Sequence, residues 1–279
     1  MNLVIQGAAI ADDDLRQISR LAGAQQIERL GAAAWRLTGA QQRTGIAEYC
    51  ARARLDFGFV PESRKLADMR LLAIDMDSTL ITIECIDEVA DLAGVKAEVA
   101  AITAAAMSGE LDYAQSLRRR VGLLRGLDQD ALARVYDERL RLSPGAETLL
   151  VAIHRAGVKT LLVSGGFSFF TERLKTRLGL DYSISNVLEI EDGRLSGRVV
   201  GAIVDAEAKA AKLRSVRDGL GITKAQIIAI GDGANDLAMM ADAGVSVAYR
   251  AKPVARGKAD YALDYSGLDG VLNLLAGAS

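Results

Sequence analysis

The chain has 279 residues, half of them hydrophobic, and a formal net charge of −2. This composition can fill a large core, and the missing basic excess argues against a nucleic-acid or membrane-surface binder. No apolar run is long enough to span a bilayer, and residues 1–10 lack a basic segment, so we expect a cytoplasmic protein without a signal peptide.

Cysteine and histidine are too scarce to carry the chemistry. Two cysteines, Cys50 and Cys85, argue against a disulfide framework, and we expect both to be small apolar helix residues. The single histidine, His154, lies in a helical pattern, where we expect a partly exposed side chain. Any catalysis must therefore use carboxylates, lysine, hydroxyls and backbone amides.

The first residues, 1–68, are predicted to form a small α+β unit. Strand-like segments at 2–7 and within 27–37 alternate with helical patterns at 12–22 and 44–54. This order resembles the small amino-acid-binding (ACT-like) regulatory domains, although no motif here supports ligand binding. The stretch 57–69, which contains Pro61, is the expected linker.

Residues 69–279 alternate between apolar runs typical of buried strands and helical patterns. The runs lie at 71–74, 160–163, 227–230, 245–248 and 261–263. The helical patterns lie at 145–156, 169–178, 206–220, 236–241 and 268–275. We therefore expect an α/β fold with a doubly wound, mostly parallel sheet.

Two longer segments interrupt this alternation. About 83–143 contains four helical patterns, at 87–92, 96–107, 113–124 and 129–140, and is predicted to be a helical cap over the carboxyl edge of the sheet. Residues 182–201 alternate around Glu191-Asp192-Gly193 and predict a β-hairpin.

Carboxylates follow two of the predicted strands. Asp75 and Asp77 come directly after 71–74, and Asp232 and Asp236 lie in the glycine-containing loop after 227–230. Ligands of open α/β sheets bind beyond the carboxyl ends of the strands, so these side chains should converge. Such a set, without histidine or thiolate, suits Mg²⁺.

Groups that bind anions follow in the same topology. Ser164, Gly165 and Gly166 come after the run 160–163, and Lys209 lies near the start of a helix. Each feature has a plainer interpretation: the paired aspartates as turn formers or helix caps, Ser-Gly-Gly as a loop, and Lys209 as a solvated helix residue. Their joint placement favours phosphoryl transfer.

These segments also carry a family resemblance. Residues 75–79, 164–167 and 231–236, together with Lys209, resemble the four motifs of the haloacid dehalogenase (HAD) superfamily of phosphohydrolases. Further segments resemble phosphoserine phosphatases: 84–88, 116–121 and 251–253. The resemblance implies a HAD-like Rossmannoid core that hydrolyses O-phosphoserine to L-serine and phosphate, the last step of serine biosynthesis.

The resemblance also implies catalytic roles. Asp75 would be the nucleophile that forms an aspartyl phosphate. Asp77 would protonate the leaving oxygen and then activate water. Mg²⁺ would be held by the side chains of Asp75 and Asp232 and by the backbone carbonyl of Asp77.

The remaining motif residues would hold the substrate. By resemblance, Ser164, Gly165 and Lys209 hold the phosphoryl oxygens. Asn235 would help to bind the substrate, and Asp236 would orient Lys209 or a water.

Substrate choice would belong to the cap. Glu84 would take the ammonium of phosphoserine and Arg120 its carboxylate, with Met107 and Tyr113 as pocket walls. Taken alone, Glu84 could equally stabilise a helix N-terminus, and Arg120 belongs to an arginine run typical of a solvated face.

Three functional alternatives stay open at this point. The chain could hydrolyse another small phosphoester, or transfer the phosphoryl group to an alcohol. More remotely, it could be an amino-acid-binding regulatory protein, against which the complete catalytic set argues. The sequence leaves the oligomeric state open and is compatible with a homodimer.

Overall fold

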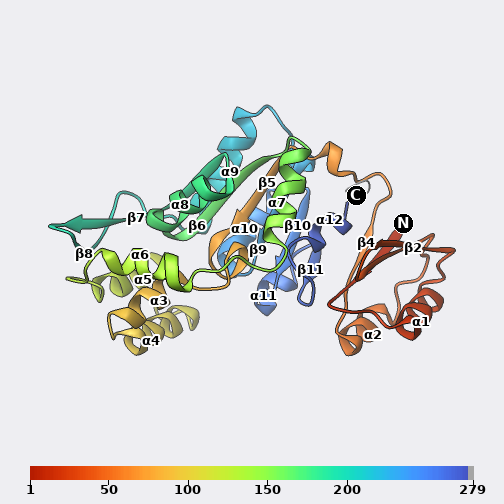
Figure 1. The fold of residues 1–279 in the computed structure, drawn as a ribbon, viewed down its shortest axis with the longest axis horizontal. Coiled ribbons are helices and arrows are strands. Elements are labelled where there is room, and N and C mark those ends of the chain that lie inside the picture. The colour runs from red at the N-terminus through yellow and green to blue at the C-terminus, as the bar shows by residue number, and fades with distance from the viewer. Residues whose placement is uncertain (276–279) are drawn as a thin grey trace.

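A computed structural model describes residues 1–275 as two β-sheets with helices packed around them (Figure 1). The four-stranded sheet of the N-terminal unit lies at one end of an elongated molecule, and the helical insert lies at the other end. The seven-stranded sheet lies between them. No helix within the described range is both long and apolar enough to cross a membrane.

The N-terminal unit has six elements in the order β-α-β-β-α-β. They are β1 (Asn2–Gln6), α1 (Asp12–Ala22), β2 (Gln26–Gly31), β3 (Ala34–Thr38), α2 (Ile46–Ala53) and β4 (Asp56–Val60). The strands are antiparallel in the order β2-β3-β1-β4. Helix α1 begins with three aspartates, whose charge stabilises its N-terminus, and ends at Gly23 in the left-handed conformation.

The strand β4 lies partly in the stretch that was predicted to be a linker. Residues 57–69 were expected to be a linker, but β4 pairs with β1 and completes the small sheet. The strand is only five residues long and ends directly before Pro61, so its alternation was too short to separate it from a linker.

Both faces of the small sheet are covered. On one face, Leu3, Ile5 and Leu37 pack with residues of α1 and α2 in a core of their own. On the other face, Val4 and Val60 join the core of the larger part of the chain.

The large sheet has the predicted doubly wound form. Its strands are β5 (Leu71–Asp75), β6 (Lys159–Phe167), β7 (Tyr182–Glu191), β8 (Arg194–Val200), β9 (Ile227–Gly231), β10 (Val245–Tyr249) and β11 (Tyr261–Leu263). Their order is β11-β10-β9-β5-β6-β7-β8, and neighbours are parallel except β7 and β8. The predicted hairpin is present, with its first strand added to the sheet beside β6.

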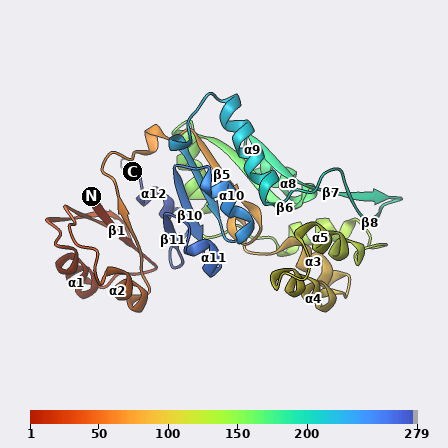
Figure 2. The same ribbon diagram turned by 180° about the vertical axis from the view of Figure 1, so that it is seen from behind.

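Helices cover both faces of this sheet. One apolar cluster joins the sheet to α7 (Ala146–Arg155), α8 (Ser168–Leu178) and α12 (Gly270–Asn273). A second cluster joins it to α9 (Ala206–Gly219) and α10 (Leu237–Ala241), which lie on the side seen in Figure 2. Short elements complete the core: η1 (Leu66–Asp68), η4 (Lys224–Gln226), η5 (Ala234–Asp236) and α11 (Pro253–Arg256).

The three residues excluded from catalysis take the expected places. Cys50 and Cys85 are buried and unpaired. His154 is exposed on α7.

The predicted helical insert leaves the core after η2 (Met76–Leu80) and returns before α7. It contains α3 (Cys85–Leu92), α4 (Lys96–Met107), α5 (Tyr113–Gly122), α6 (Asp130–Arg134) and η3 (Val135–Arg139). Its two connections to the core run side by side, because Ile81 and Leu142 form an antiparallel bridge. The hairpin also contacts the insert, since the Gly126 N–H donates to the Leu195 carbonyl at 2.8 Å. The insert is the predicted cap, and the hairpin of the core sheet contacts it.

A buried carboxylate joins the small sheet to the core. Asp56, 3% exposed at the start of β4, accepts hydrogen bonds from the backbone N–H groups of Asp264, Tyr265 and Ser266 at 2.8–3.3 Å. Beside it, a Cβ on Gly58 would lie 2.7 Å from the Tyr261 ring, so only glycine allows this close packing. The segment that follows β11 is therefore fixed by the small sheet.

We predict that Asp56→Ala lowers the stability of the chain. Three backbone donors lose their acceptor, and each unsatisfied buried donor costs about 1–3 kcal/mol. The urea midpoint should fall by an amount that corresponds to at least about 2 kcal/mol. Asp68→Ala, at an exposed aspartate of η1, is the control and should leave the midpoint unchanged. Equal midpoints for both variants would contradict the prediction.

Candidate active site

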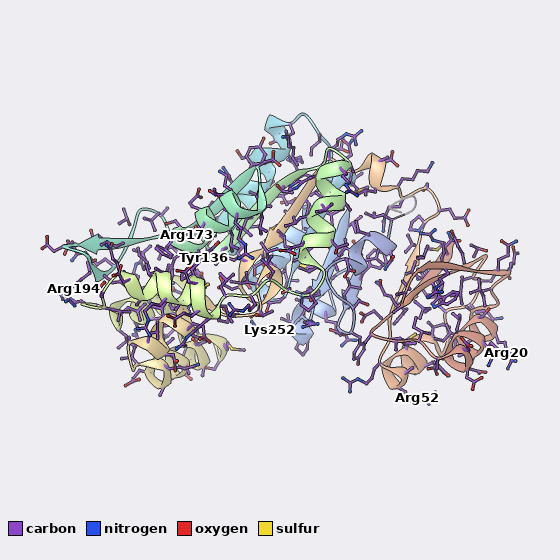
Figure 3. All side chains as sticks on the ribbon, in the orientation of Figure 1. Arg20, Arg52, Tyr136, Arg173, Arg194 and Lys252 are labelled. Atoms are coloured by element: carbon purple, nitrogen blue, oxygen red, sulfur yellow. The ribbon has the colours of Figure 1, made fainter. Side chains whose placement is uncertain are left out.

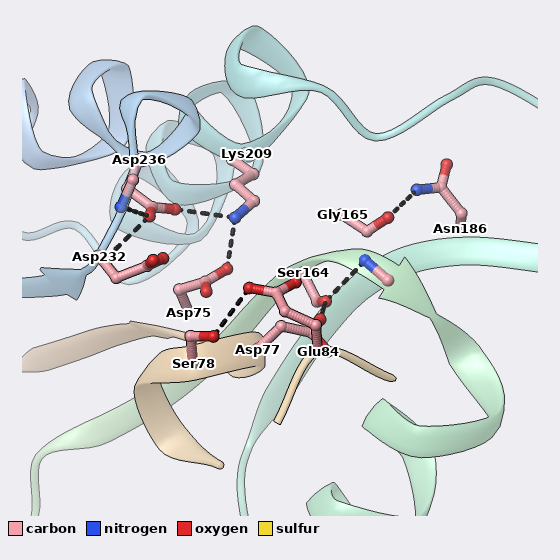
Figure 4. Close-up of polar contacts among 12 residues, drawn as sticks. Asp75, Asp77, Ser78, Glu84, Ser164, Gly165, Asn186, Lys209, Asp232 and Asp236 are labelled. Carbon is pink, nitrogen blue, oxygen red and sulfur yellow. Dashed lines mark hydrogen bonds and ion pairs between the residues drawn. The ribbon is translucent and has the colours of Figure 1, made fainter. Parts of the chain in front are cut away.

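The carboxyl ends of β5, β6 and β9 meet at one edge of the sheet, beneath the cap. A small cavity of about 100 Å³ lies there. Its lining comes from both core and cap: Asp75, Asp77, Glu84, Ile86, Tyr113, Leu117, Arg120, Gly165, Gly166, Phe167, Asp232, Asn235 and Lys252. The structure thus brings most of the predicted site residues together, and Figure 4 shows their polar contacts.

Lys209 is the centre of the buried charge network. It lies in the first turn of α9 and is completely buried. Its ammonium donates to Asp75 Oδ1 and, at 2.8 Å, to Asp236 Oδ1 (Figure 4). Burial lowers the pKa of Lys209, but the attraction of the two carboxylates outweighs it and raises the pKa above its ordinary value. The lysine is therefore a permanent buried cation, not a solvated helix residue.

Asp236 positions both the lysine and the loop after β9. Its Oδ1 accepts from Lys209, and its Oδ2 accepts from the backbone N–H groups of Asp232 and Gly233 at 3.2 and 3.1 Å. Both of its oxygens are therefore engaged within the protein.

The acidic cluster fits a hard divalent cation. Oxygens of Asp75, Asp232 and Asp236 lie within 4.8 Å of one another. Burial raises the pKa of Asp75 well above its usual range and also raises that of Asp232, and the neighbouring ammonium groups of Lys209 and Lys252 only partly oppose these shifts. Since the oxygens of Asp236 are taken, Asp75 and Asp232 are the better-suited ligands, and an oxygen-only donor set favours Mg²⁺-like ions.

The side chain of Asp77 lies outside this cluster. Its Oδ1 accepts from the Cys85 N–H and its Oδ2 from the Ser164 hydroxyl, both at 2.9 Å. Burial raises the pKa of Asp77, while these hydrogen bonds partly oppose the shift. A carboxyl group with a raised pKa can hold a proton for a leaving group.

The Ser164–Gly166 segment differs in detail from the prediction. It was expected to follow the strand at 160–163, but β6 continues to Phe167 and α8 begins at Ser168. The segment instead forms an irregularity within the strand, between the pairs Val163–Ile184 and Phe167–Asn186. Within it, the Gly166 N–H donates to Ser164 Oγ at 2.8 Å.

The cap contributes one acidic and one basic side chain to the cavity. Glu84, directly before α3, accepts a hydrogen bond from Ser78 Oγ at 2.8 Å, and burial raises its pKa. Arg120 on α5 lines the cavity, whereas its neighbours Arg118 and Arg119 are exposed. The arginine run is thus divided between a solvated face and the pocket.

The structure separates the two predicted pocket walls. Tyr113 lines the cavity, and its hydroxyl donates to the Gly165 carbonyl at 3.0 Å. Met107 is 74% exposed and lies outside the lining. It is the last residue of α4, a helix that is buried in the cap through Val99. The expectation that Met107 forms a pocket wall is therefore not met.

Two polar residues at the site had no predicted role. Ser78 holds Glu84 from a left-handed backbone conformation (φ 57°), which the sequence does not reveal. The Lys252 ammonium lies 3.3 Å from Asp232 Oδ2. Figure 3 shows that Lys252 belongs to the central part of the molecule, far from Arg20 and Arg52 of the N-terminal unit. Lys252 belongs to a segment that resembled phosphoserine phosphatases, which was the available signal.

This geometry can perform one type of chemistry. A carboxylate, Asp75, lies beside a buried ammonium and a potential cation site, and a second carboxyl group, Asp77, can exchange a proton. Such a combination stabilises the charge of a phosphoryl group during transfer.

Comparison with known proteins agrees with this chemistry. Residues 72–241 match the family of haloacid dehalogenase-like hydrolases, and residues 3–46 match a domain of unknown function (DUF4072). A phosphoserine phosphatase of Polaromonas sp. is 56% identical over 216 residues, which are 76% of this chain and 92% of that protein.

Solved structures extend the similarity to the fold. A HAD family hydrolase of Salmonella enterica serovar Typhi is 34% identical, with a TM-score of 0.89 and 99% of each chain covered. A structure described as a phospho-aspartyl intermediate analogue of phosphoserine phosphatase is 38% identical, with a TM-score of 0.70, and covers 74% of this chain and 99% of that one. The chain therefore belongs to the haloacid dehalogenase-like hydrolases and is an enzyme of that family.

Proposed function

We propose that the protein hydrolyses O-phosphoserine to L-serine and phosphate through an aspartyl phosphate on Asp75, as the last step of serine biosynthesis in the cytoplasm. The observation that carries the proposal is the presence of Asp75, Asp77, Glu84 and Arg120 in one cavity. Its volume of about 100 Å³ is far below that of sites for drug-sized ligands, roughly 300–1,000 Å³, and suits a small substrate.

The charges of the cavity complement those of phosphoserine. Glu84 pairs with the substrate ammonium, and Arg120 pairs with its carboxylate through its planar guanidinium. Lys209 and the Gly165 amide hold the phosphoryl oxygens, with Ser164 and Asn235 beside the substrate. An unmodified alkyl phosphate would offer Glu84 and Arg120 no group of opposite charge, which explains the choice of an amino-acid substrate.

The reaction has two displacements at phosphorus. Asp75 attacks the phosphorus atom, the bond to the serine oxygen breaks, and Asp77 gives its proton to that oxygen. Asp77, now a carboxylate, takes a proton from a water whose oxygen attacks the same phosphorus. The bond to Asp75 then breaks and phosphate leaves, which restores both carboxyl groups.

Mg²⁺ is the proposed cofactor. The carboxylates of Asp75 and Asp232 and the backbone carbonyl of Asp77 would hold it. When bound, it supplies positive charge that keeps Asp75 ionised and offsets the charge of the phosphoryl group.

The division of the chain is also part of the proposal. Residues 1–68 would form an ACT-like regulatory domain, in support of which they have a hydrophobic core of their own. Residues 69–279 would form the phosphatase core, with the cap inserted at about 83–143. A homodimer stays a prediction.

Asp75→Asn should lower kcat for O-phosphoserine at least about a thousandfold, because the amide cannot attack phosphorus. Phosphate release measures this loss, and circular dichroism and thermal unfolding check that the fold is kept. Turnover at the wild-type rate would contradict Asp75 as the nucleophile.

Glu84→Gln and Arg120→Met should each reduce kcat/KM for O-phosphoserine roughly 10- to 150-fold, the equivalent of losing one charge-assisted hydrogen bond. Hydrolysis of p-nitrophenyl phosphate, which has neither amino-acid charge, should change little. Arg119→Met, at the exposed neighbour on α5, is the matched control. Equal losses on both substrates would exclude an amino-acid pocket.

Asp232→Asn should weaken Mg²⁺ binding measured by titration calorimetry, since one of two carboxylate ligands is lost. Mg²⁺ should also raise the unfolding temperature of the wild type, because it binds the folded state, and should raise that of the variant less. Asp218→Asn, at an exposed aspartate of α9, should bind like the wild type. Unchanged Mg²⁺ affinity in Asp232→Asn would refute this site.

A further inference from the structure

Asn186 on β7 is a buried polar side chain outside the cavity lining. It is 1% exposed, and a buried amide is costly unless both its ends are hydrogen-bonded. Both ends are used: Nδ2 donates to the Gly165 carbonyl at 2.8 Å, and Oδ1 accepts from the Val204 N–H at 2.8 Å. Figure 4 shows the contact with Gly165. The side chain therefore joins the Ser164–Gly166 segment to the approach to α9.

The register of β6 and β7 explains why a side chain makes this contact. Val163 lies opposite Ile184, and Phe167 lies opposite Asn186. Three residues of β6 thus face a single residue of β7, Ser185, so the regular ladder of backbone hydrogen bonds is interrupted there. The amide of Asn186 takes the Gly165 carbonyl in place of a backbone donor.

The bond to Gly165 leads directly to Asp77. The Gly165 carbonyl and the Gly166 N–H belong to one planar peptide unit, so fixing one fixes the other. The carbonyl accepts from Asn186, and from Tyr113 at 3.0 Å. The Gly166 N–H donates to Ser164 Oγ at 2.8 Å, and the Ser164 hydroxyl donates to Asp77 Oδ2 at 2.9 Å.

The second bond of Asn186 leads to Lys209. Val204 precedes Asp205, whose carboxylate accepts from the Ala208 N–H and caps α9. Lys209 lies in the first turn of that helix, where its backbone N–H donates to the Asp205 carbonyl. A single buried amide thus holds the start of this helix and the Gly165–Gly166 peptide at a fixed separation.

We propose that Asn186 is a positioning residue for the reaction. It orients the Gly165–Gly166 peptide so that Ser164 holds Asp77 in the geometry for proton transfer to the leaving oxygen. The inference rests on the proposed function, in which Asp77 is the general acid. Small displacements of a catalytic group cost up to roughly a hundredfold in rate, so the loss of this contact should be measurable.

Asn186→Leu removes both hydrogen bonds without placing a charge in the core. Its kcat/KM for O-phosphoserine should fall roughly tenfold to a hundredfold. The loss should be several-fold smaller for p-nitrophenyl phosphate, because nitrophenolate leaves without a proton from Asp77. Ser185→Ala, which removes the neighbouring bond to Thr171, is the control and should match the wild type on both substrates. Equal losses of Asn186→Leu on both substrates would indicate a purely structural role and overturn the proposal.

Asn186→Asp tests the bond to Gly165 separately from the bond to Val204. It also provides a test if Asn186→Leu does not fold. It retains the acceptor for the Val204 N–H, but only a protonated carboxyl group can donate to the Gly165 carbonyl. The ratio of its kcat/KM to that of the wild type should therefore fall as pH rises through the active range. A ratio near one at every pH would overturn the proposal.

Failure of the proposed substrate gives a different result. A wild type that does not hydrolyse O-phosphoserine would contradict the substrate alone. Asn186→Leu is then compared with the wild type on p-nitrophenyl phosphate and on another alkyl phosphate that the wild type does hydrolyse. A larger loss on the alkyl phosphate supports the positioning role, and equal losses overturn it.

Discussion

The ion pair network of Lys209 is the constraint on which the site depends. A completely buried ammonium is tolerated only with charged partners, and Asp75 and Asp236 provide them. Asp75 ends β5, Asp236 follows β9, and Lys209 comes from α9, so the network joins three elements that are distant in sequence. Asp236 also holds the backbone at Asp232. The same interactions that make burial of the lysine possible therefore set the positions of Asp75, the proposed nucleophile, and of the acidic cluster.

Chemistry and substrate recognition are divided between core and cap. In the proposed function, the core supplies the groups that act on phosphorus, at the carboxyl edge of the sheet where parallel strands place them. The cap supplies Glu84 and Arg120, together with Tyr113, which reaches the Gly165 carbonyl. Cap and core are connected through the paired segments around Ile81 and Leu142. A change of the cap could therefore alter the substrate without disturbing the reaction.

Much of this organisation could be predicted from the sequence. The alternation of apolar runs and helical patterns is long and regular, and it correctly gave a mostly parallel sheet with an inserted helical cap. Asp75, Asp77, Ser164 and Lys209 were identified because each follows a strand or begins a helix. Their convergence is a consequence of parallel topology. The short strand β4 and the position of Met107 were predicted wrongly, since five alternating residues and one helix-terminal side chain carry little periodic signal.

The sequence by itself thus determined the fold class and the family, and it indicated the groups proposed to act on phosphorus, because these depend on local patterns and on residues within short motifs. Only the tertiary structure decided how those groups are held. Ser78 holds Glu84, Asp56 joins the small sheet to the core, and Asn186 takes the carbonyl of a peptide in another strand. The last two of these contacts join different elements of the fold, and all three depend on buried hydrogen-bond geometry. Such contacts have no periodicity that a sequence could display, because their partners are chosen by the packing of whole elements.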